Sequence, residues 1–303
     1  MKRFARPAEL PKPPLPEQRP SADTRHGRER QDSYAWLRAA NWQDVFKDTG
    51  LLDPSIRAHL EAENNYQKAV MSGTEALREA LVKEMRGRIK EDDSSVPAPD
   101  GPFAYGIAFE TGAEHPRFIR VPREGGPEQV MLDAQIEAAD RPYFSLGGAS
   151  HSDDHRWLAY AYDDKGSEFY SLQLRDLETG KDSETVIEDT SGGGVFSADG
   201  KYLFYVRLDA NHRPSKLFRH EIGSDPATDA LIYEEDDAGF FMGVGKTQSG
   251  DTILIEGLNA AEQADFEQYL TQVGDDVQIY GLGYDVLIED TSIEEITDNF
   301  TFG

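Results

Sequence analysis

Residues 196–209, FSADGKYLFYVRLD, place a Ser-Asp-Gly turn directly before an apolar strand. Two other stretches have the same order, HSDDHRWLAYAYDD at 151–164 and TQSGDTILIEGLN at 247–259. The strands that follow the turns begin at positions 157, 202 and 252, so they are spaced 45 and then 50 residues apart. A repeat of about 40–50 residues that holds several short strands is typical of a β-propeller, in which each repeat forms one blade.

Apolar and polar residues alternate with a period of two from residue 103 onward, between turns rich in Gly, Asp, Asn and Ser. This pattern predicts short strands. A β-sandwich would show turns about 8–12 residues apart without the longer repeat. We therefore predict a mainly β fold with an N-terminal helical segment. An incomplete propeller of about three to four blades covers residues 96–255, and an acidic β tail covers 256–303.

The N-terminal part of the chain has a different composition. Residues 1–25 form a Pro-rich extended arm, with six prolines among the first 20 residues. Residues 26–95 are predicted to form a helical segment. Asp53 followed by Pro54 predicts a helix start, because Asp caps free N–H groups and Pro fits the first helical position. Thr74 is expected to cap a second amphipathic helix in the same way.

The chain carries 57 acidic and 31 basic residues, a formal net charge of −26. This balance argues against nucleic acid and anionic membranes as partners. Residues 251–303 hold 13 of the acidic residues and no Lys or Arg, so the composition changes near position 250. With no cysteine, the chain has neither disulfides nor a thiolate site. We also expect neither a signal peptide nor a membrane span, because no apolar run is long enough.

The stretch GVGKT, residues 243–247, resembles the end of a phosphate-binding loop. That loop requires G-x-x-x-x-G-K-[ST], and its first glycine would fall at Phe240. No helical pattern follows the lysine. We therefore expect a strand with a Gly-rich turn here.

The stretch GGASHS, residues 147–152, nearly fits the nucleophile elbow G-x-S-x-G of serine hydrolases. Ser152 occupies the position of the second glycine, and a turn follows in place of a helix. His151 and His155 nearby are expected to make turn hydrogen bonds and not to act as a catalytic base. We find no other candidate nucleophile and predict no catalytic residue.

One stretch predicts a metal site. YGLGYDVLI, residues 280–288, fits the calcium-binding nonapeptide G-G-x-G-x-D-x-U-x except at its first position, and supplies Gly281, Gly283 and Asp285. The preceding nine residues are a degenerate copy that supplies Asp276. A solvated acidic hairpin is the alternative, because a calcium site of this kind needs adjacent repeats stacked in register.

Residues from about 5 to 255 resemble the N-terminal part of oligopeptidase B, in the prolyl oligopeptidase family of serine peptidases. The matching stretches, in chain order, are HGRERQDSYAWLR, EAENNYQKAVM, LVKEMRGRIKEDD, GGASHSDDHRWLAYAYDDKGSEFYSLQLRDLETG, FSADGKYLFYVRLDANHRPSKLFRHEIGS and LIYEEDDAGFFMGVGKTQSG. The resemblance implies a seven-bladed propeller that caps an α/β-hydrolase domain and admits only short peptides. It also implies cleavage after basic residues, a cytoplasmic location, and no cofactor.

None of the family's catalytic Ser, Asp or His residues has a counterpart in this sequence. We therefore expect a portion that is non-catalytic alone and serves as a substrate-gating or interaction module. Its partners would be short peptides and a hydrolase domain. That domain is either the one missing from this sequence or one supplied by another chain. An open strand edge would also favour self-association, which light scattering would report.

Residues 251–303 resemble the C-terminal end of repeats-in-toxin calcium-binding proteins, with an acidic, Lys-free composition and a terminal Phe-Thr-Phe. This resemblance implies the alternative function of a secreted acidic calcium-binding β-module, exported through a C-terminal type I signal. In that alternative the cofactor is calcium.

Overall fold

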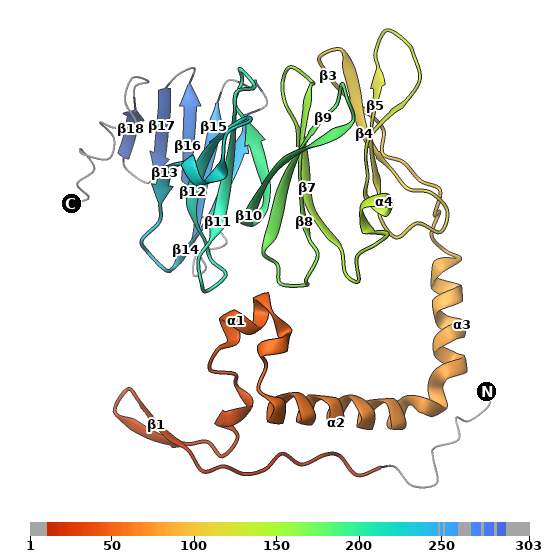
Figure 1. The fold of residues 1–303 in the computed structure, drawn as a ribbon, viewed down its shortest axis with the longest axis vertical. Helices are drawn as coiled ribbons and strands as arrows, with labels where there is room; N and C mark the ends of the chain where they lie inside the picture. Colours follow the sequence, from red (N-terminus) through yellow and green to blue (C-terminus); the bar gives the residue numbers. More distant parts are fainter. Residues whose placement is uncertain are drawn as a thin grey trace. The chain divides into compact units, whose positions relative to one another are not determined.

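The computed structural model describes residues 11–247, 249–250, 252–259, 268–273, 276–281 and 284–288. The chain divides into two compact units, Met1–Asp92 and Asp93–Gly303. The first unit holds a two-stranded hairpin and the longest helices, and the second holds the larger sheets with one short α-helix (Figure 1). The prediction of a mainly β fold with an N-terminal helical segment is confirmed. Among the described residues, no helix is long and apolar enough to cross a membrane.

The first unit begins with a hairpin and continues as short and long helices. Its elements are β1 (Ala22–Arg25), β2 (Arg28–Gln31), η1 (Ala35–Leu37), α1 (Trp42–Lys47), η2 (Thr49–Leu51), α2 (Pro54–Met71), η3 (Ser72–Thr74) and α3 (Glu75–Arg86). The described part of the Pro-rich arm packs on η1. The Trp36 indole donates to the Glu17 carbonyl at 2.9 Å, and the Arg19 guanidinium carbon lies 4.0 Å from the centroid of that ring. This arm therefore gives the Trp36 indole a partner within its own unit.

The two predicted helix starts have different outcomes. Asp53 caps α2 as predicted, because its carboxylate accepts from the backbone N–H groups of Ser55 and Ile56. The prediction that Thr74 caps α3 is wrong. The Thr74 hydroxyl donates instead to the Met71 carbonyl, at 2.7 Å, and makes no cap hydrogen bond. The reason is local, since the 3-10 turn η3 leads directly from α2 into Thr74, and a carbonyl three residues back lies within reach of its hydroxyl.

The second unit contains four consecutive antiparallel meanders. The first is the sheet β3 (Ala98–Asp100), β4 (Phe103–Ala108), β5 (Arg117–Pro122) and β6 (Gln129–Asp133), which ends in α4 (Ala134–Ala138). Seven strands follow in one sheet: β7 (Ser145–His151), β8 (Trp157–Asp163), β9 (Tyr170–Asp176), β10 (Lys181–Phe196), β11 (Tyr202–Leu208), β12 (Pro214–Glu221) and β13 (Ala230–Glu234), with η4 (Pro226–Thr228) before β13.

The long strand β10 belongs to two meanders. Residues 181–190 pair with β9, whereas residues 190–196 pair with β11, and the register shifts between Thr190 and Gly194. The seven-stranded sheet is therefore two four-stranded meanders, β7 to β10 and β10 to β13, that share one irregular strand. Four strands per unit is the composition of a propeller blade.

The last sheet contains β14 (Phe240–Lys246), β15 (Ile253–Asn259), β16 (Gln268–Val273), β17 (Asp276–Gly281) and β18 (Tyr284–Ile288), each antiparallel to the next. β15 pairs with β14 on one side and with β16 on the other. The change of composition near residue 250 therefore does not interrupt the sheet. The described part of the predicted acidic tail continues it.

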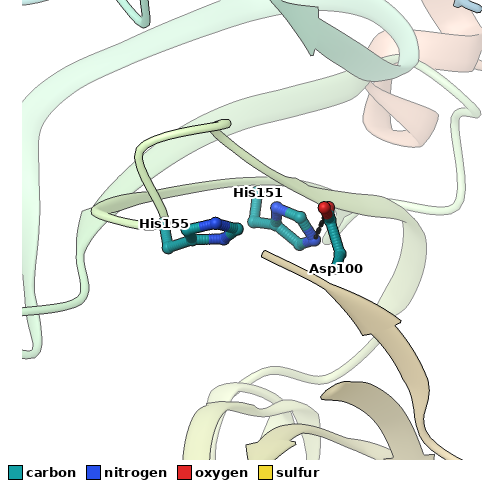
Figure 2. Close-up of side chains that lie close together, drawn as sticks. All are labelled: Asp100, His151 and His155. Carbon is teal, nitrogen blue, oxygen red and sulfur yellow. Dashed lines mark ion pairs between the residues drawn. The ribbon is translucent and has the colours of Figure 1, made fainter. Parts of the chain in front are cut away.

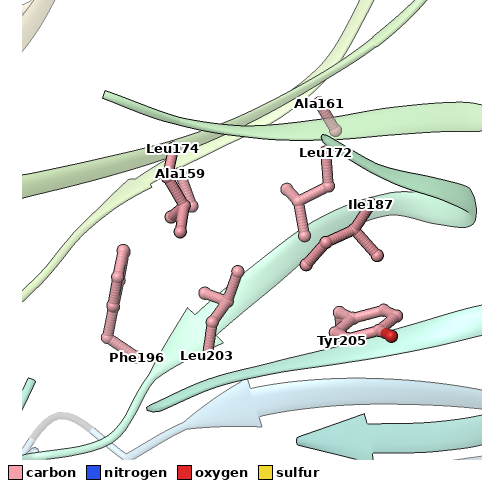
Figure 3. Packing of buried hydrophobic residues seen from close by; sticks show 8 residues of the cluster. All are labelled: Ala159, Ala161, Leu172, Leu174, Ile187, Phe196, Leu203 and Tyr205. Carbon is pink, nitrogen blue, oxygen red and sulfur yellow. The ribbon is translucent and has the colours of Figure 1, made fainter. Parts of the chain in front are cut away.

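Apolar clusters fill the spaces between consecutive meanders. In β8, Leu158 and Tyr160 pack with Met131 and Leu132 of the first meander. The alternate residues of β8, Ala159 and Ala161, point the other way, into a cluster with Leu172, Leu174, Ile187, Phe196, Leu203 and Tyr205 (Figure 3). The period of two therefore buries both faces of this strand.

The same alternation occurs in β11. Leu203 and Tyr205 belong to the cluster just described, whereas Phe204 and Val206 pack with Met242, Ile253 and Ile255 of the last sheet. Each of these strands thus joins two clusters. Burying both faces of a strand makes each meander a layer between its neighbours.

The first strands of the second and third meanders, β7 and β10, approach closely at glycines. A Cβ at Gly147 in β7 would lie 2.6 Å from the Gly192 carbonyl oxygen in β10, which is too close for any side chain. Nearby, the Ser150 hydroxyl donates to the Gly194 carbonyl at 2.7 Å. The glycines that imitate a nucleophile elbow in the sequence therefore serve strand packing.

We predict that Gly147→Ala destabilises the chain by about 1–3 kcal/mol, because the added methyl group forces backbone to move in a packed region. Gly193→Ala is the matched control, since a Cβ there meets no atom within 4 Å and its φ lies outside the left-handed region. We expect the control to change the free energy of unfolding by less than about 0.5 kcal/mol. Urea unfolding measures both variants, and equal losses would contradict the close approach of β7 and β10.

Candidate functional site

Two of the three repeated turns share one side-chain hydrogen-bonding design. In the turn between β10 and β11, the Ser197 hydroxyl accepts from the Tyr202 N–H at 3.0 Å and donates to Asp199 at 2.7 Å. Between β7 and β8, the Ser152 hydroxyl accepts from the Trp157 N–H at 2.9 Å and donates to Asp154. In these two turns a serine hydroxyl therefore closes the hairpin.

The third turn, between β14 and β15, keeps the backbone part of this design. The Thr247 N–H donates to the Thr252 carbonyl at 2.9 Å. The matching backbone bonds join Ser152 to Trp157 at 3.0 Å and Ser197 to Tyr202 at 2.9 Å. All three turns therefore have the same length and the same closing pair.

The turns at the start of the meanders contact one another. Lys246, at the end of β14, donates to the Asp153 carboxylate at 2.6 and 2.7 Å, although 93 residues separate them. A Cβ at Gly200 would lie 3.4 Å from the Asp154 carboxylate, so the two turns nearly touch. These contacts bring the first turns of the second, third and fourth meanders to one end of the strands.

The first meander joins this group through Asp100, at the end of β3. Its carboxylate lies 3.5 Å from Nε2 of His151, at the end of β7. Asp100, His151 and His155 each offer one ligand atom, and these three atoms lie within 4.8 Å of one another (Figure 2). Figure 2 shows the three side chains on the facing ends of β3 and the β7–β8 turn, with the Asp100–His151 ion pair marked. We call these three residues the Asp-His-His cluster.

Aromatic rings surround the Asp-His-His cluster. The Tyr105 ring stacks on His151 with centroids 3.7 Å apart, and its hydroxyl lies 2.7 Å from Nδ1 of His155. The buried Arg120 donates to the His155 carbonyl at 2.6 Å and lies over the Phe103 ring. This shell fixes both imidazole rings.

Burial also changes the protonation chemistry of the cluster. Desolvation lowers the pKa of His151 below its usual value, against the opposing effects of the Ser152 carbonyl and Asp100. Desolvation likewise raises the pKa of Tyr105, so its hydroxyl keeps its proton at neutral pH. The neutral imidazole form of His151, which burial favours, can accept a hydrogen bond or bind a metal ion.

Both motif-like stretches form strands, as expected for GVGKT. GVGKT falls in β14 and the residue after it, with the Lys246 amine bound to Asp153. GGASHS falls in β7 and the first residue of the following turn, which leads into a strand. The hydroxyls of Ser150 and Ser152 are used by Gly194 and Asp154. Neither a phosphate loop nor a nucleophile elbow is formed by these residues.

Only part of the Asp-His-His cluster was predictable from sequence patterns. His151 and His155 were expected to make turn hydrogen bonds, and His151 Nδ1 does contact the Ser152 carbonyl at 3.2 Å. Asp100 was missed, since it lies some 50 residues earlier and only the packing of the first sheet against the second brings it near. A buried pair was also missed, in which His220 Nδ1 lies 2.8 Å from the Asp229 carboxylate.

The predicted calcium residues lie in the last sheet. Asp276 begins β17, Gly281 ends it and Asp285 lies in β18, whereas Gly283 lies outside the described residues. β17 and β18 pair as an antiparallel hairpin, with Tyr280 opposite Asp285. Stacked calcium-binding nonapeptides form a parallel arrangement. The described pairing therefore resembles the alternative acidic hairpin, and calcium binding stays a prediction.

Comparison with known proteins gives the family. A family model described as the prolyl oligopeptidase N-terminal β-propeller domain matches residues 13–286. The chain belongs to the prolyl oligopeptidase family. The resemblance to this family predicted from the sequence is confirmed, and the match extends beyond residue 255 into the strands of the last sheet.

Curated relatives and solved structures agree with this family. Dipeptidyl aminopeptidase BI of Pseudoxanthomonas mexicana is 34% identical over 249 residues, 76% of this chain and 33% of the relative. Protease 2 of Moraxella lacunata is 28% identical, over 80% of this chain and 35% of the relative. Oligopeptidase B from Trypanosoma brucei, solved with covalently bound antipain, superposes with a TM-score of 0.74 at 24% identity, over 91% of this chain and 39% of that one. The chain therefore spans about a third of the length of the curated relatives it matches.

We predict that the Asp199 turn contributes a pH-dependent part of the stability. Burial alone would raise the pKa of Asp199, but hydrogen bonds from Lys201 and Ser197 lower it to about 2. The ionised carboxylate therefore stabilises the fold above the unfolded value of 3.8, and this contribution is lost as the pH falls from 3.8 towards about 2. Asp199→Asn should be less stable than the parent at pH 7.

Urea unfolding at several pH values between 7 and 3 tests this prediction. The difference between parent and Asp199→Asn should shrink at the acidic end, because the unfolded parent takes up a proton there. A difference that is constant over this range, or that grows towards low pH, would contradict the role of the carboxylate in the turn.

Proposed function

We propose that this chain is the propeller portion of an oligopeptidase B-like serine peptidase. In this proposal it is not catalytic by itself and acts as a substrate-gating or interaction module for a hydrolase domain. The observation that carries the proposal is the match of residues 13–286 to the family's N-terminal propeller domain, together with the four meanders described above. The share of each relative that the chain covers fits a portion of a larger peptidase.

The chemistry of the described residues supports a non-catalytic role. A serine nucleophile needs a hydroxyl within hydrogen-bond reach of a base. The Ser150 hydroxyl donates to a backbone carbonyl, and the fully buried Ser152 hydroxyl bonds to Asp154. His151 is paired with Asp100 and stacked on Tyr105. Among the residues that the structure describes, this elbow-like stretch thus lacks an available nucleophile.

The charge of the chain supports a role in admitting basic peptides. The formal net charge of −26 creates a negative potential that raises the local concentration of cations. Peptides with Arg or Lys at the cleavage position would be drawn towards such a surface. We propose short basic peptides as the substrate class of the whole enzyme on this ground and on the family resemblance.

We predict that the purified chain neither hydrolyses a dibasic fluorogenic peptide nor reacts with a fluorophosphonate probe. Fluorescence release and probe labelling measure this directly. Ser150→Ala is the matched variant, because it removes the hydroxyl of the elbow-like stretch. Turnover by the parent that the probe blocks, and that Ser150→Ala loses, would overturn the proposal of a non-catalytic portion.

A further inference from the structure

The first and second meanders meet at the Asp-His-His cluster through two histidine rings. The His151 ring stacks on Tyr105 of β4, with centroids 3.7 Å apart. The His155 ring meets the Phe103 ring at an angle of 64°, with centroids 5.7 Å apart. Both nitrogens of His155 are in contact, since Nδ1 lies 2.7 Å from the Tyr105 hydroxyl and Nε2 faces the backbone of Gly101. The two histidines are therefore packing groups between two sheets.

The fit at this contact leaves no spare room. A Cβ at Gly101 would overlap Nε2 of His155, so only glycine allows the imidazole to lie there. His155 itself has φ +60, in the left-handed region. The equivalent positions of the two other repeated turns are Gly200 with φ +68 and Gly250 with φ +81, where glycine avoids the strain. Because strain of this kind marks functional sites, we look for a role that the imidazole has and a glycine turn lacks.

Protonation would add positive charge where this contact is least able to hold it. The centroids of the two imidazole rings are 5.6 Å apart, and the buried Arg120 donates to the His155 carbonyl at 2.6 Å. Charges of like sign at such distances repel each other strongly where burial excludes water. The carboxylate of Asp100 attracts a charged His151, but its side chain is 59% exposed, so water screens the attraction.

The other charged groups of this turn have partners of their own, which are Lys246 for Asp153, Ser152 for Asp154, and Asp176 for Arg156. Burial therefore decides how the contact responds to pH. Desolvation lowers the pKa of His151 below its usual value of 6.5, although the Ser152 carbonyl and Asp100 act in the other direction. As the pH falls below 6.5, the unfolded chain takes up a proton on this residue before the folded chain does, so the folded contact loses stability.

We propose that His151 and His155 form an acid-sensitive latch between the first and second meanders. The latch is closed when the neutral ring of His151 packs against Tyr105 and the ring of His155 fills the space beside Gly101. Acid opens it, because a charged ring requires water, and water reaches the rings only when β3 and β4 move away from the β7–β8 turn. The second and third meanders are joined through the Ser150 hydroxyl, which does not titrate in this range, so the response is confined to one contact.

Hydrogen exchange of the full chain at pH 7.5 and pH 5.5 tests the latch. The hairpin of residues 196–208 is the reference in the same sample, since its turn has Gly200 in place of the histidine. On acidification we expect residues 98–108 and 145–157 to lose protection about tenfold relative to the reference, as uptake of one proton over about one pH unit allows. An equal loss in all meanders, or no loss, would overturn the proposal.

Variants assign the response to the histidines. His151→Phe keeps a flat ring against Tyr105 and removes the titrating group, whereas His155→Gly introduces the residue that the sister turns contain. The combined variant should show the same relative protection at both pH values. His26→Gly is the matched control, because His26 is exposed, has φ 51 and lies in the β1–β2 turn. A combined variant that keeps the parent's response, or a His26→Gly variant that loses it, would contradict the latch.

Discussion

The close approach of β7 and β10, the first strands of the second and third meanders, constrains the packing of the sheet unit. Gly147 of β7 faces the Gly192 carbonyl at a distance that leaves no room for a Cβ. With these strands in contact, the second strands, β8 and β11, are buried on both faces. The apolar layers then follow from the alternation of side chains along each strand. Glycine at a few positions therefore determines how the meanders stack.

The same packing brings together turns that are far apart in the sequence. Each repeated turn is closed by its own hydrogen bonds and is therefore locally determined. Its neighbours are determined by the stacking, which places Lys246 on Asp153 and Asp100 beside His151. The first turns of the second, third and fourth meanders, together with Asp100, therefore form one group of polar residues at one end of the strands.

Features that depend only on residues close together in the sequence were predictable. The alternation and the repeated Ser-Asp-Gly turns predicted the strands, and Asp53-Pro54 predicted the start of α2, because each pattern acts within a few residues. Thr74 failed as a cap, since the 3-10 turn before it offered its hydroxyl a nearer carbonyl. Asp100 could not be joined to His151 and His155 without knowing the stacking of β3 against β7. The sequence shows the glycines of β7, but not why glycine is required there. The reason is the contact with β10, some 45 residues later in the chain.

The central claim is that the first turns of the meanders meet at one end of the strands. The chain has no cysteine, so a double variant Asp153→Cys with Lys246→Cys contains only the two introduced thiols. The account predicts an efficient cross-link within one chain by a short bifunctional thiol reagent. The pair Asp153→Cys with Lys165→Cys should not react, because one strand length of about 20 Å separates the two turns. Equal cross-linking of both pairs, or none in the first, would contradict the account.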